Sequence, residues 1–136
     1  MSQPLKVLLV EDNVDAREIY TKTLAHEGFE VVAAKCVEEA LEAARARRPD
    51  VVVLDCRLPD GDGLELARTW RQTSEMSKVP VVVLTAFSAR QDVEAALLAG
   101  ADAFLVKPCT GDLLAKQIHR VLAGTRPSQT MRKPVV

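Results

Sequence analysis

Hydrophobic and polar positions along this chain form two alternating patterns. Five short apolar runs rich in Val and Leu are typical of strands: residues 5–10, 29–34, 51–54, 80–84 and 103–106. Between these runs, apolar residues recur at the three- and four-residue spacing of an amphipathic helix. Repeated strand and helix units pack as a parallel sheet covered by helices, so the pattern predicts an α/β fold.

The polarity of each run predicts its place in the sheet. The runs around Val7, Val52 and Val82 are almost wholly apolar, as expected for central strands that helices cover on both faces. The run that holds Glu30 and the run that follows Asp102 are less uniformly apolar. We therefore expect these two strands at the edges.

Short polar residues and glycine mark where the helices begin and end. The predicted N-terminal caps are the pairs Asp62 with Glu65 and Ser88 with Gln91, and the single residue Thr110. Gly124 and Pro127 stop the last helix. We expect one domain over residues 1–124, with residues 125–136 as a flexible tail or the start of a linker.

Composition excludes several function classes. With 136 residues and 48% hydrophobic content, the chain is long enough to bury a core as one domain. A formal net charge of -1 predicts no direct binding to nucleic acid and no attraction to a membrane surface. Neither a membrane span nor a signal peptide is recognisable, and three cysteines without a pairing pattern suit a reducing compartment. We expect a cytoplasmic protein without membrane insertion.

The candidate chemistry lies directly after the strand-like runs. Glu11 and Asp12 follow the first run, Asp55 ends the third, Thr85 follows the fourth and Lys107 follows the fifth. The carboxyl ends of parallel strands meet at one edge of the sheet, so these side chains should converge there. If the strand order is 2-1-3-4-5, the order reverses between the first and third strands, and ligands bind at such a reversal.

The converging side chains favour a metal ion and a phosphate. Three carboxylates in a cleft repel one another, and a cation relieves this repulsion at neutral pH. Oxygen ligands without His or Cys favour a hard ion, and few protein ligands with room for water and phosphate favour Mg2+. Lys107 and Thr85 add a positive charge and a hydroxyl donor that stabilise a phosphoryl group during transfer.

Four motifs in order resemble the receiver domain of bacterial two-component response regulators. They are LLVEDN at residues 8–13, VLDCRLPDGDG at 53–63, VLTA at 83–86 and GADAFLVKP at 100–108, and the resemblance covers residues 5–122. It implies a flavodoxin-like, doubly wound sheet of five parallel strands in the order 2-1-3-4-5, with helices on both faces. It also implies a signalling domain that is not an enzyme and assists only its own phosphorylation and dephosphorylation.

The resemblance assigns a phosphoacceptor and its metal ligands. Asp55 is expected to attack phosphorus in a phosphohistidine, carried by a sensor histidine kinase or a histidine phosphotransfer protein. Asp12, Asp55 and the backbone carbonyl of Arg57 are the expected Mg2+ ligands, and Glu11 is expected to act mainly through metal-bound water. These roles place the chain in two-component or phosphorelay signal transduction.

The resemblance also assigns phosphoryl contacts and a switch. Thr85, the amide of Ala86 and Lys107 are expected to contact phosphoryl oxygens, and the Lys107–Pro108 peptide is expected to be cis. Thr85 is expected to move toward the phosphoryl group while Phe104 turns inward behind it. This repacking would change the surface that a downstream protein target binds, and a phosphorylation-dependent homodimer through the fourth and fifth helices is possible.

Four further residues lie near the expected site in the sequence. Arg57 and Phe87 occupy positions that modulate phosphate lifetime in the family, and we hypothesise that Phe87 shields the acyl phosphate. Cys56 directly follows Asp55 and Cys109 directly follows Lys107–Pro108, and one hypothesis is that their oxidation blocks phosphotransfer. The ordinary interpretation is that both are small buried hydrophobes.

Alternative functions remain open. The expected function is a regulator made of this domain alone, and the alternative is the receiver of a longer regulator with a DNA-binding or enzymatic output domain. A dehalogenase-like phosphatase is disfavoured because its nucleophile would follow the first strand in an Asp-x-Asp pattern, which residues 11–13 lack. A degenerate receiver is disfavoured because every key residue is present.

Overall fold

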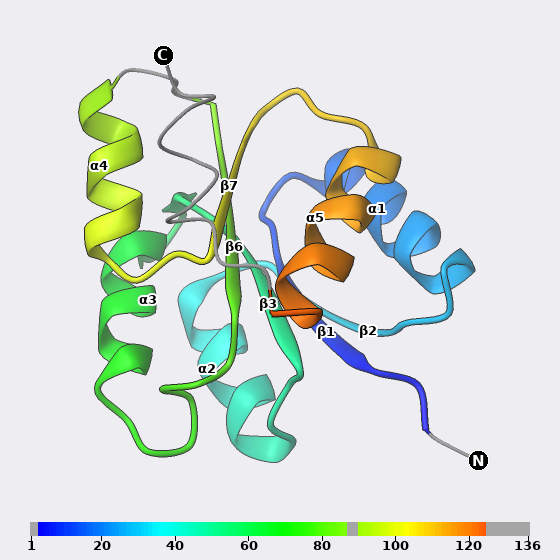
Figure 1. Cartoon of the computed structure of the whole chain (residues 1–136), viewed down its shortest axis with the longest axis horizontal. Coiled ribbons are helices and arrows are strands. Elements are labelled where there is room, and N and C mark those ends of the chain that lie inside the picture. Colours follow the sequence, from blue (N-terminus) through cyan, green and yellow to red (C-terminus); the bar gives the residue numbers. More distant parts are fainter. Residues whose placement is uncertain (1–2, 87–89, 125–136) are drawn as a thin grey trace.

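Five parallel strands form the centre of the computed structural model, which describes residues 3–86 and 90–124. The strands lie in the order β2-β1-β3-β6-β7 (Figure 1). Their bounds are β1 Lys6–Val10, β2 Glu30–Ala34, β3 Val51–Asp55, β6 Val81–Thr85 and β7 Ala103–Val106. Counted along the chain, this is the predicted order 2-1-3-4-5, and the predicted central and edge strands are confirmed.

Helices cover both faces of the sheet, as predicted. Their bounds are α1 Val14–His26, α2 Val37–Ala46, α3 Gly63–Arg71, α4 Arg90–Leu98 and α5 Gly111–Leu122. Helices α2, α3 and α4 lie on one face, and α1 and α5 lie on the other (Figure 1). Successive residues of a strand point to opposite faces, so Leu8 and Val10 pack under the first group, and Val7 and Leu9 under the second.

Most predicted helix ends agree with the structure. Asp62 accepts a hydrogen bond from the Leu64 amide at the start of α3, and Thr110 accepts one from the Leu113 amide at the start of α5. Glu65 does not complete a capping box, because it pairs with Arg68 at 3.0 Å instead. Gly124 has φ +90° after α5, which confirms it as a stop signal.

Two predictions about chain segments lie outside the described residues. The Ser88 cap is not described, and neither is the tail at residues 125–136. The domain boundary at residue 124 therefore stays a prediction. None of the helices in the described ranges has the length and apolar character that a membrane crossing requires.

A short hairpin between β3 and α3 was not predicted. It consists of β4, Arg57–Leu58, paired antiparallel with β5, Gly61–Asp62. Strands of two residues are too short to show an alternating pattern, so sequence periodicity could not reveal them. This hairpin begins two residues after Asp55 and therefore decides how the segment beside that carboxylate is held.

Gly63 allows the hairpin to close against β3. A Cβ atom at this position would lie 2.0 Å from the backbone oxygen of Asp55 and 3.2 Å from Cα of Cys56. The Gly63 amide also donates to the Cys56 carbonyl at 2.8 Å. The backbone after Asp55 can approach the start of α3 this closely only when residue 63 has no side chain.

We expect Gly63→Ala to destabilise the protein. The added methyl group overlaps backbone atoms, which cannot rotate away as a side chain would, so unfolding free energy should fall by about 1–3 kcal/mol or more. Urea denaturation followed by circular dichroism measures this loss. Gly61→Ala is the matched control, because its Cβ would meet only the side chain of Val37, at 3.2 Å. Equal stability of Gly63→Ala and the natural sequence would contradict the prediction.

Candidate functional site

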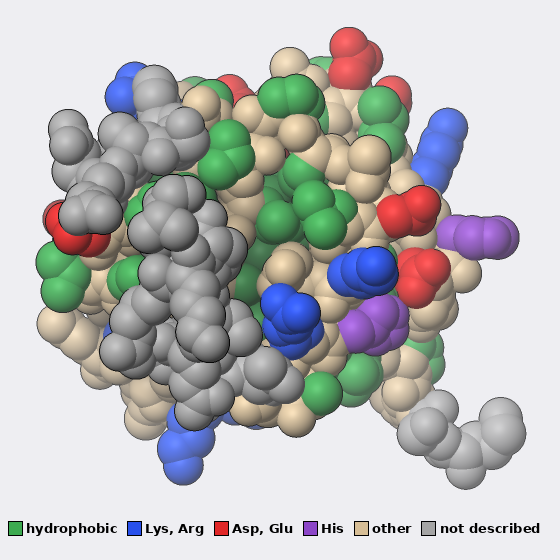
Figure 2. Space-filling view, turned by 45° about the horizontal axis from the view of Figure 1, so that its top comes forward, with side chains coloured by type: hydrophobic (Ala, Val, Ile, Leu, Met, Phe, Trp, Pro, Cys, Tyr) green, Lys and Arg blue, Asp and Glu red, His purple; other side chains and the backbone are tan. Residues whose placement is uncertain are grey.

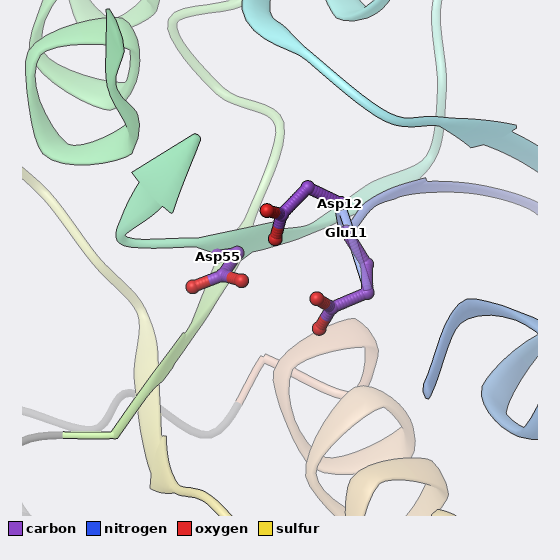
Figure 3. Close-up of side chains that lie close together, drawn as sticks. All are labelled: Glu11, Asp12 and Asp55. Atoms are coloured by element: carbon purple, nitrogen blue, oxygen red, sulfur yellow. The ribbon is translucent and has the colours of Figure 1, made fainter. Parts of the chain in front are cut away.

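Three carboxylates meet at the carboxyl ends of β1 and β3. These strands are neighbours, and Val10 lies opposite Leu54, so Glu11 and Asp55 continue from adjacent positions. Glu11, Asp12 and Asp55 each offer an oxygen atom within 4.8 Å of the others, and Figure 3 shows their side chains grouped together. The predicted convergence is therefore observed at the predicted reversal of strand order.

The three carboxylates differ in burial and in partners. Glu11 is fully buried, Asp55 is 7% exposed and Asp12 is exposed. The Asn13 amide donates to Oε2 of Glu11 at 3.1 Å, and the Arg57 amide donates to Oδ1 of Asp55 at 3.3 Å. The exposed Asp12 and the nearly buried Asp55 thus form an acidic site that is open on one side.

Lys107, the residue directly after the edge strand β7, joins the acidic cluster. Its Nζ donates to Oε1 of Glu11 at 2.8 Å and to Oδ2 of Asp55 at 3.3 Å. The Lys107 amide donates to the Thr85 carbonyl at 2.7 Å, which fixes its backbone beside the end of β6. The Lys107–Pro108 peptide is cis, as expected.

Burial and neighbouring charge shift the pKa values of this ion cluster. Burial raises the pKa of Asp55, the charge of Glu11 raises it further, and the charge of Lys107 opposes both. Burial alone would lower the pKa of Lys107, but its bond to Glu11 and the charges of Asp55 and Glu11 together raise it. Lys107 is therefore cationic at neutral pH, while the charge of Asp55 destabilises the folded protein.

We expect Asp55→Asn to raise the melting temperature at neutral pH without metal. The folded-state pKa of Asp55 lies above the unfolded value, so the folded protein binds this proton more tightly. Stability therefore decreases as pH rises through that folded-state pKa. Asparagine carries no charge and avoids this loss, so the difference should shrink toward acidic pH. Calorimetry at neutral and acidic pH measures it, and a lower melting temperature for Asp55→Asn at neutral pH would overturn the expectation.

Thr85 lies at the carboxyl end of β6 beside an open hollow. It is 2% exposed and borders a cavity of about 400 Å³. The other lining residues come from the segment after β3 and the start of α3: Cys56, Arg57, Leu58, Gly61, Asp62 and Leu64. The following residue, Ala86, is exposed. The hollow thus lies between the carboxyl end of β6 and the segment that directly follows Asp55.

The remaining predicted residues differ in how they relate to the site. Phe104 is half-buried and packs against the core cluster beneath α2, α3 and α4. Cys56 and Cys109 are half-buried and form no disulfide, and the Tyr20 hydroxyl donates to the Cys109 carbonyl at 3.0 Å. Phe87 lies outside the described residues, so its shielding role is not tested.

One contact to the acidic segment was missed. The Arg17 guanidinium, from the first turns of α1, donates to the backbone carbonyl of Glu11 at 2.9 Å and to that of Asp12 at 3.3 Å. It therefore holds the backbone of the acidic pair while leaving both carboxylates directed into the site. An arginine six residues after Glu11 has no distinctive pattern in sequence, because only the turn of α1 brings it back.

The donor set fits Mg2+. All the candidate side-chain ligands are carboxylate oxygens, and no His side chain belongs to this cluster in the described part of the chain. Hard oxygen ligands in small number suit Mg2+, which keeps several water molecules and takes phosphate oxygens. The exposure of Asp12 leaves the solvent side open for such ligands.

Comparisons with known proteins agree with this geometry. A family model described as the response regulator receiver domain matches residues 7–119. The chain belongs to this family. The receiver domain is 41% identical over 130 residues to the KDP operon transcriptional regulatory protein KdpE of Escherichia coli. This match covers 93% of this chain and 56% of KdpE. The chain thus spans little more than half the length of this curated relative.

Solved structures support the same assignment. The receiver domain resembles the chemotaxis response regulator CheY4 of Vibrio cholerae with a TM-score of 0.83 and 32% identity, over 88% of this chain and 99% of CheY4. It also resembles the receiver domain of the sensor histidine kinase PA1611 from Pseudomonas aeruginosa, with a TM-score of 0.81 and 30% identity. That match covers 89% of this chain and 99% of that one, and the PA1611 structure has a magnesium ion coordinated in its active-site cleft.

Proposed function

We propose that this receiver domain accepts a phosphoryl group on Asp55 from a phosphohistidine, with Mg2+ as cofactor. The Asp55 carboxylate accepts a bond from the cationic Lys107 at 3.3 Å and lies within 4.8 Å of ligand atoms of Glu11 and Asp12, and the two residues that follow it line the open hollow. These surroundings of Asp55 are the observation on which the proposal rests. Response regulators receive phosphoryl groups from sensor histidine kinases, which makes such a kinase or a phosphotransfer protein the proposed donor.

The proposed reaction is a direct transfer. A bond forms between a carboxylate oxygen of Asp55 and phosphorus, the phosphorus–nitrogen bond of the phosphohistidine breaks, and its electron pair remains on the imidazole nitrogen. The product is an acyl phosphate on Asp55. Water later attacks this phosphorus, which restores the carboxylate and releases inorganic phosphate. The domain assists only these reactions of its own side chain, so we do not propose an enzyme with an external substrate.

The surrounding residues would orient and neutralise the phosphoryl group. Lys107 lies 3.3 Å from the Asp55 carboxylate, so its Nζ can follow a phosphoryl oxygen attached there. The Thr85 hydroxyl and the Ala86 amide, at the end of β6, are the proposed donors to the other oxygens. Such fixed donors stabilise charge that develops during transfer.

Asp12, Asp55 and the Arg57 carbonyl are the proposed Mg2+ ligands, with Glu11 acting through bound water. Bound Mg2+ would supply positive charge that draws phosphate oxygens to Asp55. Glu11 suits an indirect role, because Lys107 and the Asn13 amide already occupy its two oxygens. Asp12 is exposed and suits direct ligation.

Phosphorylation would affect a protein partner by changing how side chains pack near the surface. Phe104 is half-buried beside the core, so a Thr85 shift could change how deeply it packs. The proposed readers are a downstream protein or a second copy bound through α4 and α5. We propose a cytoplasmic location and no direct nucleic-acid contact for this domain. The face shown in Figure 2 mixes basic side chains with acidic and hydrophobic ones, which does not favour a polyanion.

A second candidate is a longer regulator with an output domain. KdpE is a transcriptional regulatory protein, and the match covers 56% of its length. This coverage supports the alternative of a longer regulator, whereas a regulator made of this domain alone is the expected function. Sequencing the natural reading frame beyond Val136 distinguishes the two.

Phosphorylation by acetyl phosphate tests the proposed function. Intact mass spectrometry should show one added phosphoryl group in the presence of Mg2+ and none after chelation. Peptide mapping should place this group on the peptide that contains Asp55. A folded protein that gains no phosphoryl group with Mg2+ present would refute the proposal.

A further inference from the structure

The first turn of α2 takes its cap from a different part of the chain. Cys36 is the N-terminal cap residue of this helix, and its side chain makes no capping hydrogen bond. The Val37 amide instead donates to Oδ1 of Asp60 at 2.7 Å, and the Glu38 amide donates to Oδ2 of Asp60 at 3.1 Å. Asp60 thus satisfies two amides that a helix leaves open, from 23 and 22 residues away in sequence.

Asp60 lies at the turn of the β4–β5 hairpin, and packing reinforces its contact with α2. Leu58 and Gly61 pair across this hairpin, and Asp60 lies between them in sequence. A Cβ atom added at Gly61 would lie 3.2 Å from Cγ2 of Val37, so the hairpin backbone lies close to this side chain. Leu58 and Val37 also pack against the same core cluster. The hairpin turn therefore rests on the first turn of α2.

The charge of Asp60 suits this place. The bond from the Val37 amide, together with that from the Glu38 amide, lowers the pKa of Asp60. The carboxylate is therefore ionised at neutral pH, where it faces the positive end of the α2 dipole. An ionised acceptor also makes stronger hydrogen bonds than a neutral one.

The segment before α2 also contacts the first acidic loop. The Glu11 amide donates to the carbonyl of Ala34 at 2.9 Å, and Ala34 lies two residues before Cys36. Residues 34–38 thus hold both the backbone of Glu11, after β1, and the hairpin that begins at Arg57, after β3. These are the two chain segments that supply the proposed metal ligands.

We propose that Asp60 is a positioning residue for the metal site. It would hold the hairpin on α2, and so keep the Arg57 carbonyl and Asp55 in place relative to Glu11 and Asp12. This inference rests on the proposed Mg2+ site. Its competitor is a purely local role, in which Asp60 stabilises α2 and has no effect on the metal ligands.

Three variants separate these roles. Asp60→Ala removes both acceptors, and Asp60→Asn keeps one carbonyl acceptor. The double variant Cys36→Ser with Asp60→Ala gives α2 a cap of its own without restoring the bond to the hairpin, since serine is a strong N-terminal cap. Asp112→Ala is the matched control, because it removes an acidic side chain from the first turn of α5.

The measurements are urea denaturation and Mg2+ titration by calorimetry. Asp60→Ala should weaken Mg2+ binding about tenfold, the lower end of the effect of outer residues that orient metal ligands. Asp60→Asn should recover most of this loss. Compared with Asp60→Ala, the double variant should have a higher free energy of unfolding but the same weakened Mg2+ affinity. Asp112→Ala should bind Mg2+ as the natural sequence does.

Two results would overturn the inference. One is unchanged Mg2+ affinity in Asp60→Ala, and the other is recovery of affinity together with stability in the double variant. Amide hydrogen exchange of residues 57–62 without metal is an independent readout, and it should speed up in Asp60→Ala and stay fast in the double variant. If the natural sequence binds no Mg2+, the proposed function fails, while this exchange result still reports whether Asp60 holds the hairpin.

Discussion

Asp55→Asn is expected to abolish phosphorylation by acetyl phosphate. Asparagine has nearly the same shape as aspartate but only one acceptor oxygen, so it can keep either the bond from the Arg57 amide or the bond from Lys107, which reach different oxygens of Asp55. A neutral carboxamide oxygen is, however, a much weaker nucleophile than a carboxylate and cannot give the same acyl phosphate. Intact mass spectrometry after incubation with acetyl phosphate and Mg2+ should show the unmodified mass alone.

The remaining carboxylates of the cluster make this a demanding test. Glu11 is fully buried and held by Lys107, so it is a poor alternative acceptor, whereas Asp12 is exposed. Asp15→Asn is the matched control, because Asp15 is a nearby acidic residue, in the first turn of α1, and lies outside the cluster. It should be phosphorylated normally. A phosphoryl group on Asp55→Asn, mapped to Asp12, would contradict the assignment of the acceptor.

Asp12→Asn is expected to weaken Mg2+ binding most strongly while leaving the fold intact. Asp12 is exposed, and its carboxylate makes no ion pair or hydrogen bond to other described residues, so the substitution should change unfolding free energy by less than about 0.5 kcal/mol. A proposed direct ligand matters more than an outer residue, so affinity should fall by at least about a hundredfold. Calorimetric titration with Mg2+ measures this loss.

The rate of phosphorylation should depend on Mg2+ binding. At limiting Mg2+ the rate of phosphorylation of Asp12→Asn should fall in parallel with its Mg2+ affinity, and excess Mg2+ should restore part of it. Asp15→Asn again serves as the control for loss of one negative charge near the site. Unchanged Mg2+ affinity in Asp12→Asn would show that the metal, if bound, is held by other residues.

The sheet and the main site residues were predictable for one physical reason. Strands buried on both faces must be continuously apolar, so each strand is visible as a run, and the first polar residue after a run marks its carboxyl end. Asp55, Glu11 and Lys107 are all of this kind. In the structure, Nζ of Lys107 donates hydrogen bonds to the carboxylates of both Glu11 and Asp55.

Residues that act through backbone contacts were not predictable in this way. Arg17 holds carbonyl groups of the acidic loop, and Asp60 holds amides of α2. Arg71 similarly donates to the carbonyls of Gly100 and Val79 at the opposite end of the sheet, and pairs with the buried Asp102. In sequence these are ordinary charged residues, because their partners are set by loops that bring distant backbone groups together.

Residue type and spacing were enough to predict the strands, their central or edge position, the helices on both faces and the convergence of carboxylates at one sheet edge, because burial and the two backbone periodicities depend on these alone. The strand order came instead from the resemblance to receiver domains. The hairpin after β3, the close approach at Gly63 and the cap that Asp60 gives to α2 became visible only in the folded structure. These depend on distances between segments far apart in the chain, which no local pattern of hydrophobic and polar residues records.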